Sequence, residues 1–125
     1  MLIEFKKFLS TLQDVSEVKD LGDDTILFSY NGFSFLFAID KGDQNYIRLL
    51  LPRVAEITDF SDVNAVINEC NTNYKALKVI SLDNYVWLSI EQLIYSKEDN
   101  YLLFNRMIHI LLFAIRKIQS DYLNN

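Results

Sequence analysis

Hydrophobic and polar residues alternate most regularly between Asp24 and Asp40, and this stretch predicts a β-hairpin. Its centre is Asn31-Gly32, a dipeptide typical of two-residue type I′ turns because both residues tolerate a positive φ. Such a turn sets the strand register. One face then carries the cross-strand pairs Tyr30–Phe33, Phe28–Phe35 and Ile26–Phe37, and the other carries Ser29–Ser34, Leu27–Leu36 and Thr25–Ala38. A lone hairpin is marginally stable in water, so we expect other elements to cover the aromatic face.

Apolar residues at helical spacing predict three amphipathic helices in the rest of the chain. The first spans Leu2–Gln13. The second begins near Asp59 or Ser61, either of which is a suitable N-cap, and ends near Asn71. The third and longest spans about Lys97–Tyr122, and Ser96 with Asp99 resembles a capping box at its start.

Three further stretches favour β-strands. Tyr46–Leu51 is predicted as a third strand, which Pro52 either ends or places at a sheet edge because proline donates no hydrogen bond. Ala76–Leu82 and Tyr85–Gln92 predict a second hairpin around Asp83-Asn84. Asp14–Asp23 loses the helical period, and Gly22 with Asp23 and Asp24 is interpreted as the turn into the first hairpin. The predicted order is α-β-β-β-α-β-β-α, an α+β fold with one antiparallel sheet of about five strands and helices on one face.

Length and charge restrict the class of protein. The 125 residues predict a single domain over 1–125, and 50% hydrophobic with 14% aromatic residues predicts an ordered globule. The formal net charge is −5. Because nucleic-acid binding requires clustered Lys and Arg to neutralise phosphates, this balance argues against a nucleic-acid partner.

The cysteine content and the apolar segments bear on localisation. Cys70 is the single cysteine, which excludes an internal disulfide and fits a reducing compartment. The first ten residues include Glu4 and lack the apolar core of a secretory signal. The longest apolar run, Ile110–Ile115, is far shorter than a membrane span. We expect a cytoplasmic protein without a membrane partner.

Motifs for catalysis or cofactor binding are absent from the sequence. Three glycines, at positions 22, 32 and 42, fall in predicted turns and form no phosphate-binding loop. No GxSxG elbow occurs, and one histidine with one cysteine makes no zinc cluster. His109 has no acid three or four residues away to orient it and is interpreted as a surface residue. Cys70 shares the apolar helical phase and is interpreted as a buried, inert thiol. We therefore expect no catalytic residue and no cofactor.

Six acidic residues cluster near the predicted turns. Their spacing does not match a calcium-binding loop, and aspartate is an ordinary turn residue, so we expect no metal site. The six are Glu17, Asp20, Asp23, Asp24, Asp40 and Asp43.

Some apolar residues fall where helices on one side of the sheet do not reach. Two interpretations remain open: isolated surface apolar residues are common, and aromatic clusters rimmed by polar groups often mark interfaces. The candidate interaction surface comprises Ile80, Tyr85, Trp87, Ile110 and Phe113.

Two long segments resemble the YbjN family of small bacterial proteins, which are labelled sensory transduction regulators. The first is GDDTILFSYNGFSFLFAIDKGDQNYIRLLLPRV, and the second is DVNAVINECNTNYKALKVISLDNYVWLSIEQLIYSKEDNYLLFNRMIHILLFAIRKI. The resemblance implies a fold similar to type III secretion chaperones and carries no catalytic residues. It suggests regulation or the holding of another protein.

Two functions follow as hypotheses. The first is a non-enzymatic protein-binding module, chaperone-like or regulatory, that binds another protein or itself as a homodimer. The alternative is a small-molecule sensor or minor enzyme with a pocket between sheet and helices, lined by Phe28, Phe35 or Phe37.

Overall fold

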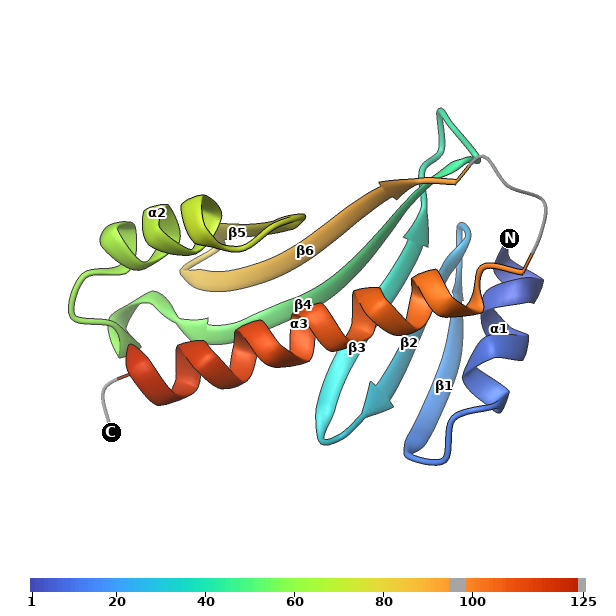
Figure 1. Ribbon diagram of the computed structural model, residues 1–125, viewed down its shortest axis with the longest axis horizontal. Coiled ribbons are helices and arrows are strands. Elements are labelled where there is room, and N and C mark those ends of the chain that lie inside the picture. Colours follow the sequence, from blue (N-terminus) through green and yellow to red (C-terminus); the bar gives the residue numbers. More distant parts are fainter. Residues whose placement is uncertain (95–98, 124–125) are drawn as a thin grey trace.

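The computed structural model, which describes residues 1–94 and 99–123, is an α+β fold built on one antiparallel sheet. The six strands have the spatial order β1-β2-β3-β4-β6-β5. Figure 1 shows α3 running across the sheet from α1 at one end to α2 at the other. The elements are α1 (Leu2–Ser10), β1 (Val15–Gly22), β2 (Thr25–Tyr30), β3 (Phe33–Ile39), β4 (Tyr46–Glu56), the 3-10 helix η1 (Ile57–Asp59), α2 (Val63–Asn73), β5 (Leu77–Leu82), β6 (Tyr85–Leu93) and α3 (Tyr101–Asp121). The predicted fold class is confirmed, with six strands instead of five.

The two predicted hairpins are confirmed together with their registers. Asn31 and Gly32 have φ values of 52° and 82°, as a type I′ turn requires. All six predicted pairs between β2 and β3 are present. In the second hairpin Asp83 and Asn84 also have positive φ values of 53° and 67°, and Leu82 pairs with Tyr85.

The stretch before the first hairpin, for which the sequence predicted no strand, is an edge strand, β1, and the predicted turn at its end is present. It pairs with β2 through a two-residue turn at Asp23-Asp24, where φ is positive at both residues. Register shifts interrupt the pairing twice, and Glu17 at the first has a φ of 53°. Bulges of this kind remove the period of two along a strand, and the sequence pattern therefore concealed β1.

The third predicted strand is longer than expected and is central. β4 continues through Pro52 to Glu56, and it lies between β3 and β6. Pro52 is tolerated because β4 pairs with β3 only up to Leu50, and its register with β6 shifts between Leu51 and Ala55. The proline thus occupies a bulge at which one neighbouring strand has already ended.

Two helices begin later than the sequence predicted. The N-cap of α2 is Asp62, whose side chain accepts a hydrogen bond from the amide of Ala65, and not Asp59 or Ser61. Asp59 belongs to η1. Of the capping box predicted for the last helix, Ser96 lies outside the described residues. The helix itself starts after Asn100 and not near residue 97.

Contacts between the first and last helices set the start of α3. The backbone and side-chain amides of Asn100 both donate to Glu4 Oε1, at 2.9 and 3.1 Å. Asn100 is buried, so Glu4 of α1 satisfies polar groups that water does not reach.

The first helix is shorter than predicted: α1 ends at Ser10, three residues before the predicted end at Gln13.

The core beneath α1 and α3 is a cluster of stacked phenylalanines, which we call the phenylalanine cluster. Phe5 stacks on Phe37 with ring centroids 3.8 Å apart, and Phe104 meets Phe5 edge-on at 5.1 Å. Phe28 and Phe35 stack at 5.2 Å, and both are fully buried. The first and last helices therefore cover the aromatic face of the first hairpin, as expected.

A groove beside α3 as the candidate functional site

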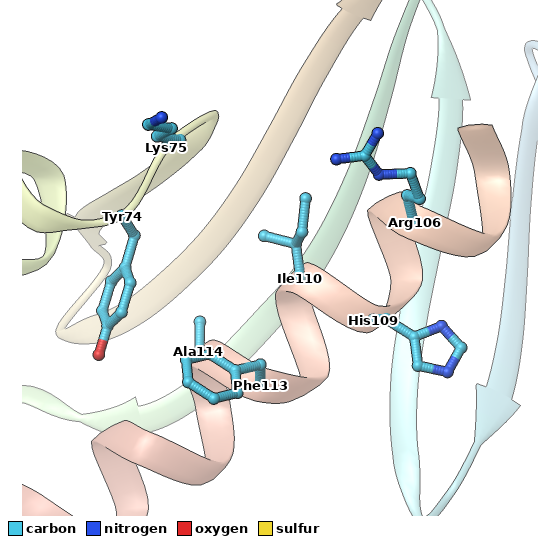
Figure 2. A pocket seen from close by; sticks show the side chains of 7 residues that line it. All are labelled: Tyr74, Lys75, Arg106, His109, Ile110, Phe113 and Ala114. Atoms are coloured by element: carbon cyan, nitrogen blue, oxygen red, sulfur yellow. The ribbon is translucent and has the colours of Figure 1, made fainter. Parts of the chain in front are cut away.

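A groove of about 410 Å³ lies between α3 and the connection from α2 to β5. Figure 2 shows Tyr74 and Lys75 on that connection, facing the outer side of α3, with Ile110 between Lys75 and Arg106. Its lining comprises Tyr74, Lys75, Arg106, His109, Ile110, Phe113 and Ala114.

Aromatic and aliphatic side chains form the floor of the groove. The rings of Tyr74 and Phe113 meet edge-on with centroids 6.3 Å apart. Phe113 is 62% exposed, whereas Ile110 is partly buried and Ala114 is buried. An aromatic ring held in place on one edge and open to solvent on the other is a ready anchor for a second apolar group.

The rim of the groove is basic. Lys75, Arg106 and His109 are exposed, and none of these three forms an ion pair within the part of the chain that the structure describes. A second hollow of about 500 Å³ continues along α3, shares His109 and Phe113 with the first, and adds Arg116 and Lys117. Positive charge therefore follows the outer side of the helix beside its apolar floor.

Two side-chain contacts place α2 so that the groove exists. The Asn71 side chain donates to the carbonyl of Val79 at 3.0 Å and accepts from its amide at 2.7 Å. These bonds tie α2 to the outer edge of β5, where no further strand is paired among the described residues. At the far end of α3, the hydroxyl of Tyr122 donates to the carboxylate of Glu69 on α2, which raises the pKa of Tyr122 to about 12.

Tyr74 and His109 line the groove, and Cys70 lies on the neighbouring helix α2. Burial raises the pKa of Tyr74, so its hydroxyl stays protonated near neutral pH. The ring Nδ1 of His109 lies 2.7 Å from the Asn105 carbonyl oxygen and, as the partner is an acceptor, carries the donated hydrogen. Burial, with the charge of Glu69, also raises the pKa of the Cys70 thiol, which is the opposite of an activated nucleophile.

The structure separates the five residues of the predicted interaction surface into two groups. Ile110 and Phe113 lie together in the groove. Ile80, Tyr85 and Trp87 lie on the other face of the sheet, where Ile80 is paired directly with Trp87. The sheet stands between the groups, so one partner patch does not include both.

The outer face of the sheet is partly committed to internal contacts. The Trp87 indole donates to the Leu82 carbonyl at 3.3 Å, and Arg53 lies over the Tyr85 ring at 5.2 Å. Near the middle of this face Glu91 accepts hydrogen bonds from the Tyr46 hydroxyl and from Arg48 Nε. The Tyr46 hydrogen bond, with Arg48 and Lys78, holds the pKa of Glu91 below its usual value.

The predicted acidic turn residues serve the turns. Asp20, Asp40 and Asp43 each accept a hydrogen bond from a backbone amide two residues ahead. Within residues 1–94 and 99–123, no group of three or more His, Cys, Asp or Glu side chains is arranged to hold a metal ion.

The alternative pocket predicted beside Phe28, Phe35 and Phe37 is filled by packed side chains. These three rings are 0% exposed and belong to the phenylalanine cluster. The groove described above lies on the outside of α3 and not in the layer between sheet and helices.

Sequence reasoning missed Tyr74, Lys75 and Arg106 as site residues. Arg106 could have been found, because no Asp or Glu occurs from Tyr101 to Ser120 in a chain of net charge −5. Tyr74 and Lys75 could not, since their place opposite α3 depends on how α2 docks against β5.

Comparisons with other proteins add no homologue to this description. None of the α-helices in the described ranges is long and apolar enough to cross a membrane. The chain matches no protein-family model and no curated protein sequence.

Proposed function

We propose that the protein is a non-enzymatic binding module that holds a segment of another polypeptide in the groove beside α3. The observation that carries the proposal is the exposed Phe113 ring, set edge-on to Tyr74 in a groove with a basic rim. Interfaces are enriched in aromatic residues and arginine, and this groove combines both.

The chemistry of the groove supports binding over catalysis. A catalytic site needs a nucleophile or base held by an orienting partner. In the groove the Asn105 carbonyl orients His109, but among the described residues the lining contains no Ser, Thr or Cys that this histidine could activate as a nucleophile. The resemblance to the YbjN family, and through it to type III secretion chaperones, supports the same function and stays a prediction.

Site-specific photo-crosslinking tests the proposal. Benzoylphenylalanine would replace Phe113 in one variant and Leu21 in a matched control, since Leu21 is similarly exposed at 55% but lies on the edge strand β1. Both variants would be expressed in the native cells and irradiated. We expect a defined crosslinked polypeptide, identified by mass spectrometry, from position 113 and not from position 21.

Two results would contradict the proposal. If position 113 gives no crosslink, or if both positions capture the same set of proteins, the groove has no specific polypeptide partner. A circular dichroism melt of each variant is the control, because an unfolded chain would expose both positions equally.

A small-molecule sensor is the second candidate, favoured by the volume of the groove. About 410 Å³ lies within the usual range of ligand sites, and the basic rim would suit an anion. A thermal-shift screen against anionic metabolites tests this function. A ligand at a hundred times its Kd adds about 2.7 kcal/mol to the free energy of unfolding, and the Arg106→Glu variant should lose that gain.

Self-association, the other predicted mode of binding, has its candidate surface on the outer face of the sheet. Ile80 and Trp87 are paired there and partly exposed. Light scattering of the wild type and of Trp87→Ser tests it. A dimer that Trp87→Ser converts to a folded monomer is expected, and a wild-type monomer would contradict it.

A further inference from the structure

The outer side of α3 has a charge opposite to that of the whole chain. From Tyr101 to Ser120 the helix contains no acidic residue, while the chain as a whole has 17 acidic and 12 basic residues. Arg106, His109, Arg116 and Lys117 are all exposed. Lys117 pairs with Asp121 at 3.1 Å, and neither arginine has an ion-pair partner in the described ranges.

The basic side chains of α3 lie along the groove in which we propose that a polypeptide binds. Arg106 and Phe113 are seven residues apart, as are His109 and Arg116, so they follow one side of the helix over two turns each. The ten residue-to-residue steps from Arg106 to Arg116 span about 15 Å along the helix axis. Lys75 faces the same groove from the α2–β5 connection. We call this surface, comprising Tyr74, Lys75, Arg106, His109, Ile110, Phe113 and Arg116, the basic groove.

We propose, resting on the polypeptide-binding function above, that the basic groove binds an acidic segment that places one large apolar side chain beside Phe113. Carboxylates flanking that side chain would pair with Arg106 and Lys75. Arginine forms bidentate bonds with carboxylates, and an exposed aromatic edge beside it gives the apolar anchor. A segment of about ten helical residues, or about five extended residues, matches the length of the surface.

Charge argues against a second copy of α3 as the occupant. In a two-fold dimer the same patch lies on both subunits. Arg106 and Arg116 would then face the same basic residues of the second copy. Like charges brought together at an interface cost free energy, so the patch disfavours symmetric pairing and favours a partner of opposite sign.

The packing of α3 argues against a lipid surface. A helix that binds a membrane inserts its apolar side, but the apolar side of α3 is in the protein core. Ile108, Leu111 and Ile115 on that side are 0% exposed. Of the exposed apolar side chains of α3, Leu102 lies at the start of the helix, away from the groove lining. Phe113, with Ile110, sits in a groove between two elements, which suits a polypeptide side chain.

Fluorescence anisotropy with three labelled peptides tests the proposal. Each peptide has about twelve residues. A central tryptophan is common to all three, and the flanking positions carry glutamate, glutamine or lysine. We expect the glutamate peptide to bind at least about tenfold more tightly than the glutamine peptide and the lysine peptide to show no binding. The affinity should fall as salt rises, since the pairs are exposed to solvent.

Matched charge reversals locate the binding. Arg106→Glu should lower the affinity for the glutamate peptide by about tenfold or more and should gain affinity for the lysine peptide. Lys41→Glu is the control, because Lys41 is exposed in the turn between β3 and β4 and makes the same change in net charge away from the groove. It should leave both affinities unchanged.

Several results would overturn the inference. Equal binding of the three peptides, no binding of the glutamate peptide up to about 1 mM, or equal effects of Arg106→Glu and Lys41→Glu would each do so. So would Arg106-dependent binding to vesicles of anionic phospholipid without peptide binding. A specific crosslink at position 113 alongside any of these would leave the polypeptide-binding function standing and remove only the acidic partner.

Discussion

Two phenylalanines of α3 differ in burial: one lies in the core and the other is exposed to solvent. Phe104, in the first half of α3, joins the phenylalanine cluster and is 1% exposed. Phe113, nine residues later, touches Tyr74 and stays 62% exposed. Both are phenylalanines in one amphipathic helix, so residue type does not distinguish them. What differs is the side of the helix on which each one lies.

The cover available at each end of the sheet explains the two outcomes. At the β1 end of the sheet the start of α3 lies beside α1 (Figure 1), and Phe104 of α3 meets Phe5 of α1 edge-on at 5.1 Å. At the other end α2 is tied to the edge of β5 by Asn71 and meets α3 through Tyr74. A groove remains on the outer side of that contact. The first end encloses its aromatic rings, and the second leaves the Phe113 ring 62% exposed.

Truncating a ring of the phenylalanine cluster should give the largest loss in the free energy of unfolding. Phe37→Ala removes a fully buried ring that stacks on Phe5 at 3.8 Å. Lost burial and the remaining cavity should lower the free energy of unfolding by about 3–5 kcal/mol. Chemical denaturation measures the change, and a loss below about 1 kcal/mol would show that the cluster collapses around the gap.

Releasing α2 from β5 should give the next largest effect. Asn71→Ala removes two hydrogen bonds to Val79 and leaves that amide without its partner, which should cost about 1–3 kcal/mol. Hydrogen exchange at Val79 should speed up. Asn68→Ala, an exposed position of the same helix, is the control and should leave that exchange rate unchanged.

High pH should loosen the contact between α2 and α3. The hydrogen bond to Glu69 raises the pKa of Tyr122 from its ordinary value of 10.0 to about 12. A raised pKa means that the folded state favours the protonated hydroxyl. The stability that this bond contributes is therefore complete below pH 10.0 and is lost as the pH rises through about 12. Tyr122→Phe should remove this part of the alkaline loss.

Ultraviolet titration of the tyrosinates measures the same property directly. The difference between the wild type and Tyr122→Phe isolates one of the seven tyrosines. A difference curve centred near pH 10.0 would contradict the hydrogen bond to Glu69.

Truncating Phe113, whose exposed ring contacts Tyr74, should give the smallest change in the free energy of unfolding. Phe113→Ala alters a ring that is mostly in solvent, so the free energy of unfolding should change by about 0.5 kcal/mol or less. The glutamate-peptide affinity should nevertheless fall, since the anchor is lost. A stability loss as large as that of Phe37→Ala would mean that Phe113 is a core residue and would end the contrast between the two phenylalanines of α3.

Local sequence chemistry was sufficient for the elements with a regular period. Asn31-Gly32 and Asp83-Asn84 specified two turns, and the alternation on either side specified which residues face the core. The alternating pattern did not predict strands where bulges break the period of two. The bulges of β1 hid a strand, and the register shift beside Pro52 let a strand continue where proline predicted its end.

The sequence predicted only those apolar residues of the groove that lie on the last helix. Ile110 and Phe113 interrupt the polar side of a helix, and this periodicity is visible in the chain alone. The same reasoning joined them to Tyr85 and Trp87, which the sheet separates from them. Which exposed apolar residues share a surface depends on distances in space that residue spacing does not contain.

The amino-acid order by itself therefore determined the two predicted hairpins, the buried side of the regularly patterned elements and the lack of acidic residues from Tyr101 to Ser120, because these depend on neighbours within a few residues. The docking of α2 against β5, which brings Tyr74 and Lys75 to Phe113 and Arg106, was decided only by tertiary structure. The place of α2 beside α3 rests on contacts between residues distant in sequence, such as Glu69 with Tyr122. The groove exists because these contacts fix the α2–β5 connection beside α3 at one end of the sheet, while α1 and α3 enclose the other.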